Sequence, residues 1–88
     1  MQLPIKTRIL QYAIEKDAEF TAADAYKDLK DEYPGERFFN LKTVEQYVDS
    51  FLGVSFLYAT RTEFDDVGNL LIYCKVTDYG KSRQKYIH

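Results

Sequence analysis

The spacing of apolar residues changes once along this chain, at Gly53, and this change constrains the fold more than any other feature of the sequence. Before Gly53, apolar residues recur at intervals of three and four, which is typical of amphipathic helices. After Gly53, the runs "VSFLYATRTEF" and "LLIYCKVT" are rich in β-branched and aromatic residues, which is typical of strands. The sequence therefore predicts an α+β fold in which the helices precede the strands.

Three helices are predicted before Gly53, and the first spans about residues 5–17. The second follows Thr21, which forms a capping-box pattern with Asp24, and it ends at Pro34-Gly35 because proline disfavours a helical residue before it. The third follows Asn40, a favourable N-cap, and closes at Gly53. The inner face of the third helix is predicted to comprise Leu41, Val44, Val48, Phe51 and Leu52.

The two β-rich runs predict a hairpin whose loop, "DDVGN", is about five residues long. Asp65 and Asp66 favour the turn because their side chains accept hydrogen bonds from nearby backbone, and Gly68 or Asn69 can adopt a positive φ. The second strand alternates, so one of its faces is predicted to join the core. That face comprises Leu70, Ile72, Cys74 and Val76.

The predicted order is helix, helix, helix, strand, strand and a short last helix capped by Thr77, with Phe20 as a short strand that joins the hairpin. This order, over residues 1–88 as a single domain, resembles the winged helix-turn-helix family. The segment "VTDYGK" is also similar to the "LT-x-x-G" segment that follows the wing in many bacterial regulators of the PadR and MarR kinds. The connection "PGERFFN" is longer than the tight turn of the simplest helix-turn-helix. The resemblance implies a three-helix bundle with a β-hairpin wing. It also implies that the third helix of the bundle enters the major groove of DNA.

The charged residues give a formal net charge of -2 and a pI of about 5.3, which is not the basic balance of many nucleic-acid binders. The acids are concentrated in residues 15–36, which carry eight acids against three lysines, whereas both ends of the chain are basic. Because local potential governs a groove contact, a basic surface is compatible with this acidic chain.

The reactive residues do not form a recognisable catalytic or metal-binding pattern. Cys74 is the single cysteine and His88 the single histidine, so neither an internal disulfide nor a Cys/His metal cluster is expected. Cys74 lies within an apolar strand, where a buried structural thiol is the usual role. The four glycines are isolated, so there is no phosphate-binding loop. The sequence therefore predicts neither an enzyme nor a cofactor or metal site.

The chain also lacks the sequence features of membrane insertion and secretion. No stretch approaches the roughly 18 apolar residues of a membrane span. The N-terminus "MQLPIKTRILQY" lacks the apolar run of a secretory signal. With a single cysteine, the chain suits a reducing compartment, so a cytoplasmic location without membrane association is expected.

The resemblance implies a DNA-binding surface on the third helix and the wing. Gln46 can pair with adenine, Lys42 can reach guanine or a phosphate, and Thr43 can meet a phosphate or a thymine methyl group. Glu45 and Asp49 lie on the same helix and weaken this interpretation. The residues predicted to contact DNA are Arg37, Asn40, Lys42, Thr43, Gln46, Ser50, Arg61 and Lys75. Those predicted to support phosphate binding are Lys6, Arg8, Lys81, Arg83 and Lys85.

A protein-interaction module without DNA affinity is the alternative function, because winged helices also serve this role and tyrosines are enriched at interfaces. The tyrosines predicted to form a surface patch are Tyr58, Tyr73, Tyr79 and Tyr86. A homodimer is compatible with both functions. The resemblance implies that its interface lies in the last segment, at Tyr79, Tyr86 and Ile87, or on the first helix. The leading hypothesis is a transcriptional regulator that binds double-stranded DNA, with the interaction module left open beside it.

Overall fold

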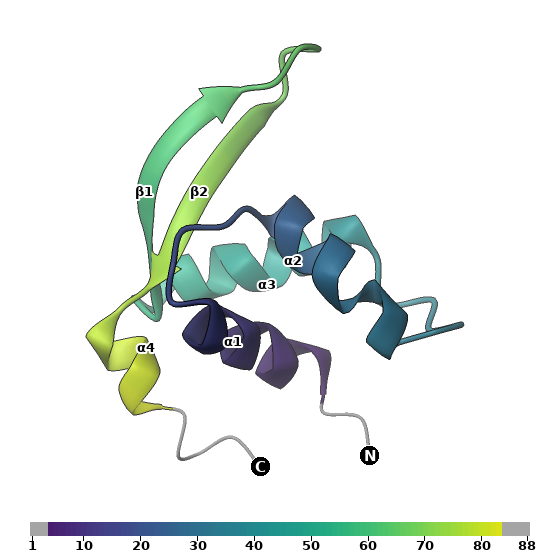
Figure 1. The fold of residues 1–88 in the computed structure, drawn as a ribbon, viewed down its shortest axis with the longest axis horizontal. Helices are drawn as coiled ribbons and strands as arrows, with labels where there is room; N and C mark the ends of the chain where they lie inside the picture. The colour runs from purple at the N-terminus through teal and green to yellow at the C-terminus, as the bar shows by residue number, and fades with distance from the viewer. Residues whose placement is uncertain (1–3, 84–88) are drawn as a thin grey trace.

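The structure of the protein, a computed structural model, describes residues 4–83. In chain order it contains α1 (Ile5–Lys16), α2 (Ala22–Leu29), the 3-10 helix η1 (Lys30–Glu32), α3 (Leu41–Gly53), β1 (Leu57–Phe64), β2 (Leu70–Val76) and α4 (Asp78–Ser82). Helices α1, α2 and α3 pack together, and the two strands form an antiparallel hairpin that extends away from them, with α4 at its base (Figure 1). The predicted α+β class and the predicted order of elements are confirmed, and the topology is that of a winged-helix-like domain.

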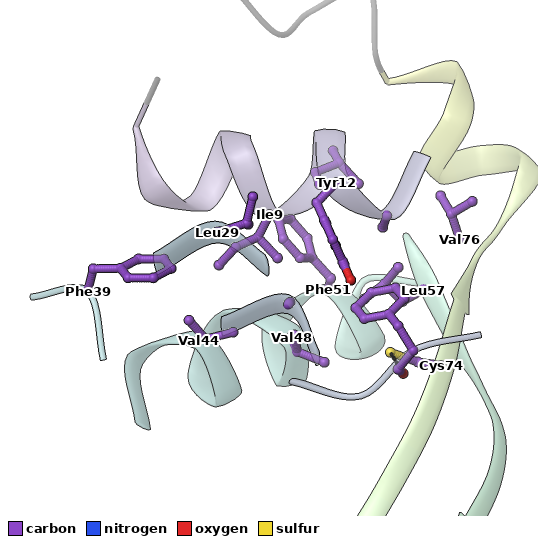
Figure 2. Close-up of a cluster of buried hydrophobic side chains, with 14 of the residues drawn as sticks. Ile9, Tyr12, Leu29, Phe39, Val44, Val48, Phe51, Leu57, Cys74 and Val76 are labelled. Atoms are coloured by element: carbon purple, nitrogen blue, oxygen red, sulfur yellow. Dashed lines mark hydrogen bonds between the residues drawn. The ribbon is translucent and has the colours of Figure 1, made fainter. Parts of the chain in front are cut away.

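The hydrophobic core lies between the three helices and the base of the hairpin (Figure 2). Its largest fully buried side chains are Ile9, Phe20, Leu29, Val44, Leu57 and Cys74. Tyr12 packs edge-on against Phe20, with ring centroids 5.3 Å apart. Its hydroxyl donates a hydrogen bond to Asp28 over 2.7 Å, which connects α1 to α2. Apolar burial from α1, α2, α3, β1 and β2 thus holds the base of the hairpin against the helices.

Phe20 joins the hairpin as predicted. Its backbone N–H donates to the carbonyl oxygen of Cys74 over 2.9 Å, and the N–H of Cys74 donates back over 2.8 Å. The thiol of Cys74 also donates to the carbonyl oxygen of Phe20. Burial raises the pKa of this thiol to about 12, so Cys74 stays protonated at neutral pH, and the prediction that it is buried is confirmed.

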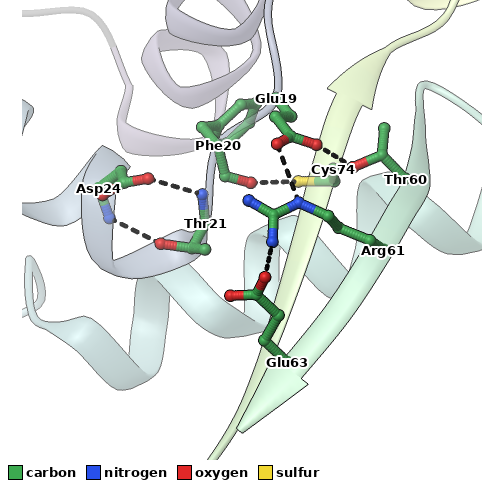
Figure 3. Close-up of polar contacts among 8 residues, drawn as sticks. All are labelled: Glu19, Phe20, Thr21, Asp24, Thr60, Arg61, Glu63 and Cys74. Atoms are coloured by element: carbon green, nitrogen blue, oxygen red, sulfur yellow. Dashed lines mark hydrogen bonds and ion pairs between the residues drawn. The ribbon is translucent and has the colours of Figure 1, made fainter. Parts of the chain in front are cut away.

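The predicted helix caps are also present. The hydroxyl of Thr21 accepts from the N–H of Asp24, and the Asp24 carboxylate accepts from the N–H of Thr21, which completes the capping box (Figure 3). The hydroxyl of Thr77 accepts from the N–H of Gly80 over 2.8 Å at the start of α4. These local contacts fix where α2 and α4 begin.

The second helix ends earlier than the prediction that placed its end at Pro34-Gly35. Regular α-helix stops at Leu29, the chain tightens into η1, and Tyr33 adopts a φ of -129° and a ψ of 54°. Pro34 disfavours the helical conformation at Tyr33, and a helix commonly tightens to 3-10 geometry in its last turn. Tyr33 is nevertheless buried, and its ring stacks on Phe39 with centroids 4.9 Å apart.

The third helix ends at Gly53, as predicted, but Gly53 is still helical, and the left-handed residue that follows the helix is Ser55, with a φ of 65°. The N–H of Phe56 donates to the carbonyl of Phe51, and the N–H of Ser55 donates to the carbonyl of Leu52, which is a Schellman motif. The rings of Phe51 and Phe56 stack across this turn, so apolar contact fixes its position. The strand therefore begins at Leu57.

Candidate functional site

A groove of about 560 Å³ lies between α3, the N-terminus of α2 and the outer half of β2. Here the hairpin extends beyond the helices (Figure 1), and β2 with the hairpin loop supplies the side of the groove that faces α3. The larger apolar residues that line the groove are Leu41, Val48, Leu52, Leu70, Leu71 and Ile72. Such a concave surface with an apolar lining is typical of a binding site.

Acidic residues also line this groove. Glu45 and Asp49 lie on α3, and Asp65 lies at the start of the hairpin loop. Backbone hydrogen bonds from Asn69 and Val67 lower the pKa of Asp65, so this carboxylate stays ionised well below neutral pH. Within the described part of the chain, none of the residues that line the groove is a lysine or an arginine. The groove is therefore apolar and negatively charged.

The outer end of the hairpin adds further exposed apolar surface to the groove. Phe64 is 74% exposed, Val67 is 80% exposed and Leu70 is 53% exposed. Phe64 and Leu70 pair across the two strands, so this surface is continuous with the groove lining. The loop between them forms as predicted: the Asp65 side chain accepts from backbone N–H groups, and Gly68 has a φ of 88°. Exposed apolar surface of this kind is common where a partner protein binds.

Arg8, one of the cations predicted to support phosphate binding, is paired with acids of the protein itself. Its guanidinium donates two hydrogen bonds to Glu32, over 2.9 and 3.0 Å, and one to Glu15 over 3.1 Å. The Glu32 contact is the main cause of a raised Arg8 pKa, and the side chain is only 17% exposed. Arg8 therefore connects α1 to η1, and a phosphate would have to compete with Glu32 and Glu15 for its guanidinium.

Arg61, which was predicted to contact DNA, is held on the outer face of the hairpin. It donates to Glu19 over 3.0 Å and pairs with Glu63 (Figure 3). It also lies 3.7 Å from the ring centroid of Tyr73. Hydrogen bonding to Glu19 raises the pKa of Arg61. Thr60, at a bulge in β1, donates to the same Glu19 carboxylate over 2.8 Å. The contacts of Arg61 thus attach the hairpin to the segment before Phe20.

The remaining predicted DNA contacts are spread over α1, α3, β2 and α4. Lys81 pairs with Asp17 over 2.9 Å, and this contact lowers the pKa of Asp17. Lys6 lies 5.8 Å from the ring centroid of Phe51, Lys75 is half-buried on β2, and Arg83 follows α4. Lys85 lies outside the described residues. Four predicted residues are exposed on or just before α3, namely Arg37, Lys42, Gln46 and Ser50, with Thr43 half-buried beside them.

Asn40 forms the N-cap of α3, as predicted from its position. Its side-chain oxygen accepts from the N–H of Thr43 over 2.9 Å, and its amide donates to the carbonyl of Arg37 over 3.2 Å. Both ends of the amide are thus used within the protein. The structure gives Asn40 a role in starting α3, beside its predicted role in DNA contact.

Replacing Asn40 with alanine is expected to lower the free energy of unfolding by about 1 kcal/mol, whereas Asn40→Asp retains the stability because aspartate caps equally well. Urea denaturation followed by circular dichroism measures both values. Ser50→Ala is a control, since Ser50 is exposed on α3 and away from the cap. If Asn40→Asp lost as much stability as Asn40→Ala, the cap would not be the cause.

The predicted dimer interface is described only in part. Tyr79 is exposed on α4, and its ring packs edge-on against Phe56 with centroids 5.2 Å apart. Tyr86 and Ile87 lie outside the described residues. Tyr58 is exposed on β1, while Tyr73 is partly covered by Arg61. A homodimer through this segment stays a prediction.

Sequence reasoning assigned several groove residues to the core instead. Leu41 and Leu70, predicted to be core residues, are exposed and line the groove, and Leu52 is only partly buried. Val44, Val48, Phe51, Cys74 and Val76 are buried as predicted. The predicted inner face of α3 is thus buried except on the side nearest the hairpin, where Leu41 and Leu52 line the groove. Apolar residues on that side, next to Glu45 and Asp49, were the available signal of a binding surface.

The part of the chain that the structure describes, residues 4–83, holds no group of three or more His, Cys, Asp or Glu side chains placed to bind a metal ion. None of the helices that it forms is both long enough and apolar enough to cross a membrane. Comparison of the sequence with models of protein families and with curated proteins finds no match. The groove beside the hairpin is therefore identified as the candidate functional site from its shape and lining residues alone.

Proposed function

We propose that this winged-helix-like domain is a non-catalytic protein-interaction module that binds its partner in the groove between α3 and the hairpin. The composition of the groove lining supports this proposal, because apolar residues are joined there by three acids and no cation. An apolar surface favours a protein partner, since burying it releases free energy of about 25 cal/mol per Å². The acids disfavour a phosphate backbone in the same place.

The charges of the neighbouring elements support the same proposal. Helix α3 carries Lys42 against Glu45 and Asp49, so its net charge is -1. The hairpin also has a net charge of -1, with Arg61 and Lys75 against Glu63, Asp65 and Asp66. These are the two elements that would approach DNA in a winged helix, and phosphates bind best where Lys and Arg outnumber acids.

Selection of random peptides on the immobilised domain tests the proposal. We expect enriched peptides to combine aliphatic residues with Lys or Arg, and their affinity to fall about tenfold or more with Glu45→Lys, as a close charge reversal of this kind predicts. Asp31→Lys is the matched control, because Asp31 is an exposed acid on η1, outside the groove. Circular dichroism confirms that each variant is folded. Peptides that bind both variants equally well would place the interaction elsewhere.

Binding of duplex DNA is the second candidate function, and three exposed residues favour it: Arg37 before α3, and Lys42 and Gln46 in its N-terminal half. A labelled duplex titrated with protein at increasing salt distinguishes the two candidates. Binding that weakens steeply with salt, and is lost with Lys42→Ala and Gln46→Ala together, would favour DNA. The absence of binding at low salt, combined with groove-dependent peptide binding, would favour the interaction module.

A further inference from the structure

We infer that the partner of the groove is a basic segment of another protein, bound in extended conformation as an added strand on the outer edge of β2 at Leu70–Ile72. This inference rests on the proposed function and names the partner's chemistry and its mode of binding. Three observations carry it: the free edge of β2, the groove beside that edge, and the acids on α3.

The bridge between Phe20 and Cys74 identifies the backbone groups on the outer edge of β2. Phe20 and Cys74 exchange two backbone hydrogen bonds, so the N–H and carbonyl of Cys74 point away from β1. In an antiparallel strand this orientation recurs at every second residue. Ile72 and Leu70 therefore present their N–H and carbonyl groups to the same edge. Within residues 4–83, Cys74 is the position where another segment bridges this edge.

The chain leaves this edge immediately after Phe20. Thr21 begins the capping box, and α2 then turns away from the hairpin (Figure 3). The groove opens at this point, between Thr21–Ala23 and Leu70–Ile72. A bound segment would thus pair with β2 at Leu70–Ile72, next to the bridge that Phe20 makes with Cys74. Exposed strand edges bind extended peptides in this way, through backbone hydrogen bonds and pockets for alternate side chains.

The groove lining determines which side chains the bound strand needs. Leu70 and Ile72 share one face of β2 with Cys74, and across the groove from them lie Val48 and Leu52. Glu45 and Asp49 lie on the same helix, beside these apolar residues. Complementary side chains are two aliphatic residues on one face of the strand, flanked on that same face by Lys or Arg. The partner is therefore a basic segment with an apolar centre.

Capped synthetic peptides test this mode of binding on the whole protein. The probe is Lys-Thr-Val-Thr-Val-Thr-Lys, in which both valines and both lysines lie on one face of a strand. The control is Thr-Lys-Val-Thr-Val-Lys-Thr, which has the same length and moves its lysines to the opposite face. We expect the probe to bind about tenfold more tightly than the control in a fluorescence titration, and Glu45→Lys or Asp49→Lys to abolish this preference.

Methylation of backbone nitrogens distinguishes an added strand from other bound conformations. Two further probes carry N-methyl groups on every second amide, in the odd or in the even positions. Because a strand directs alternate amides to one edge, we expect one set to abolish binding and the other set to retain it. If both sets bound like the parent peptide while Glu45→Lys still weakened binding, the groove would bind peptides without strand addition, and this inference alone would be overturned.

Two other outcomes would also overturn the inference. One is that neither the lysine-bearing probe nor its control binds to folded protein. The other is self-association of the protein without peptide, abolished by Glu45→Lys, which would assign the edge of β2 to a second copy of the chain. Failure of the proposed function itself is distinct, because peptide selection would then enrich no sequence that depends on Glu45.

Discussion

Replacing Gly80 with alanine is expected to lower the free energy of unfolding by about 3 kcal/mol, the upper part of the range for overpacked sites. A Cβ atom at this position would overlap the carbonyl oxygen of Phe56 and lie 3.0 Å from the Cγ2 atom of Val76. The carbonyl of Phe56 cannot easily move away, because it accepts hydrogen bonds from both the N–H and the hydroxyl of Thr77. Helix α4 must therefore shift or detach from the base of the hairpin.

Gly53→Ala is the matched control for this substitution. Gly53 also lies in a helix, but a Cβ atom there would meet no atom within 4 Å apart from its chain neighbours and the nearby backbone of its own helix. Alanine favours a helix by about 1 kcal/mol over glycine, so the control should gain stability. Urea denaturation of the two variants measures the difference, with the slope of the transition as a check on two-state unfolding. Equal stabilities of the two variants would contradict the packing shown here.

Phe20→Ala is the second substitution with a large expected effect, a loss of about 3–5 kcal/mol. Phe20 is fully buried, packs against Tyr12, and belongs to the segment that bridges β2. Domains of this size have total stabilities of about 5–15 kcal/mol, often near the lower value. From a total of about 5 kcal/mol the variant would keep only about 0–2 kcal/mol, so up to about half of it would be unfolded. The cavity left by the ring accounts for the loss, since alanine can still form the backbone bridge.

The control for this second prediction is Phe64→Ala, the same change at an exposed position. Phe64 is at the outer end of β1, so its truncation should change stability by no more than about 0.5 kcal/mol. Thermal unfolding followed by circular dichroism measures both variants under one set of conditions. A small effect of Phe20→Ala, similar to that of Phe64→Ala, would show that the hairpin does not depend on the core for its position.

The features that could be predicted from the sequence are those that neighbouring residues determine. The capping box joins Thr21 to Asp24, and Thr77 caps the first turn of α4, so each signal lies within three residues. The loop conformation at Asp65 and Gly68 is local in the same sense. The bridge at Phe20 is the exception, because it joins residues that are far apart in the chain. The short strand at Phe20 is part of the predicted order of elements that resembles the winged helix-turn-helix family.

The candidate site could not be predicted because it depends on contacts between distant residues. Arg8 meets Glu32, and Arg61 meets Glu19 across the hairpin, although neither pair is close in sequence. Composition gives the number of charges but not which of them neutralise each other. Likewise, periodicity marks Leu41 and Leu70 as apolar without showing that the hairpin passes beyond the helices at that point. The groove forms because the hairpin extends farther than the helices that pack against its base.

The bridge between Phe20 and Cys74 also has a consequence for motion. The hairpin is fixed at its base, where Cys74 and Val76 are buried. At its outer end, the support comes from the pairing of β1 with β2. Thermal bending of such an arm displaces its outer end most, and the groove lies along that moving part. A partner that holds the arm against α3 removes this freedom, so part of the binding free energy offsets a loss of conformational entropy. Stiffening the arm would therefore tighten binding without adding any contact to the partner.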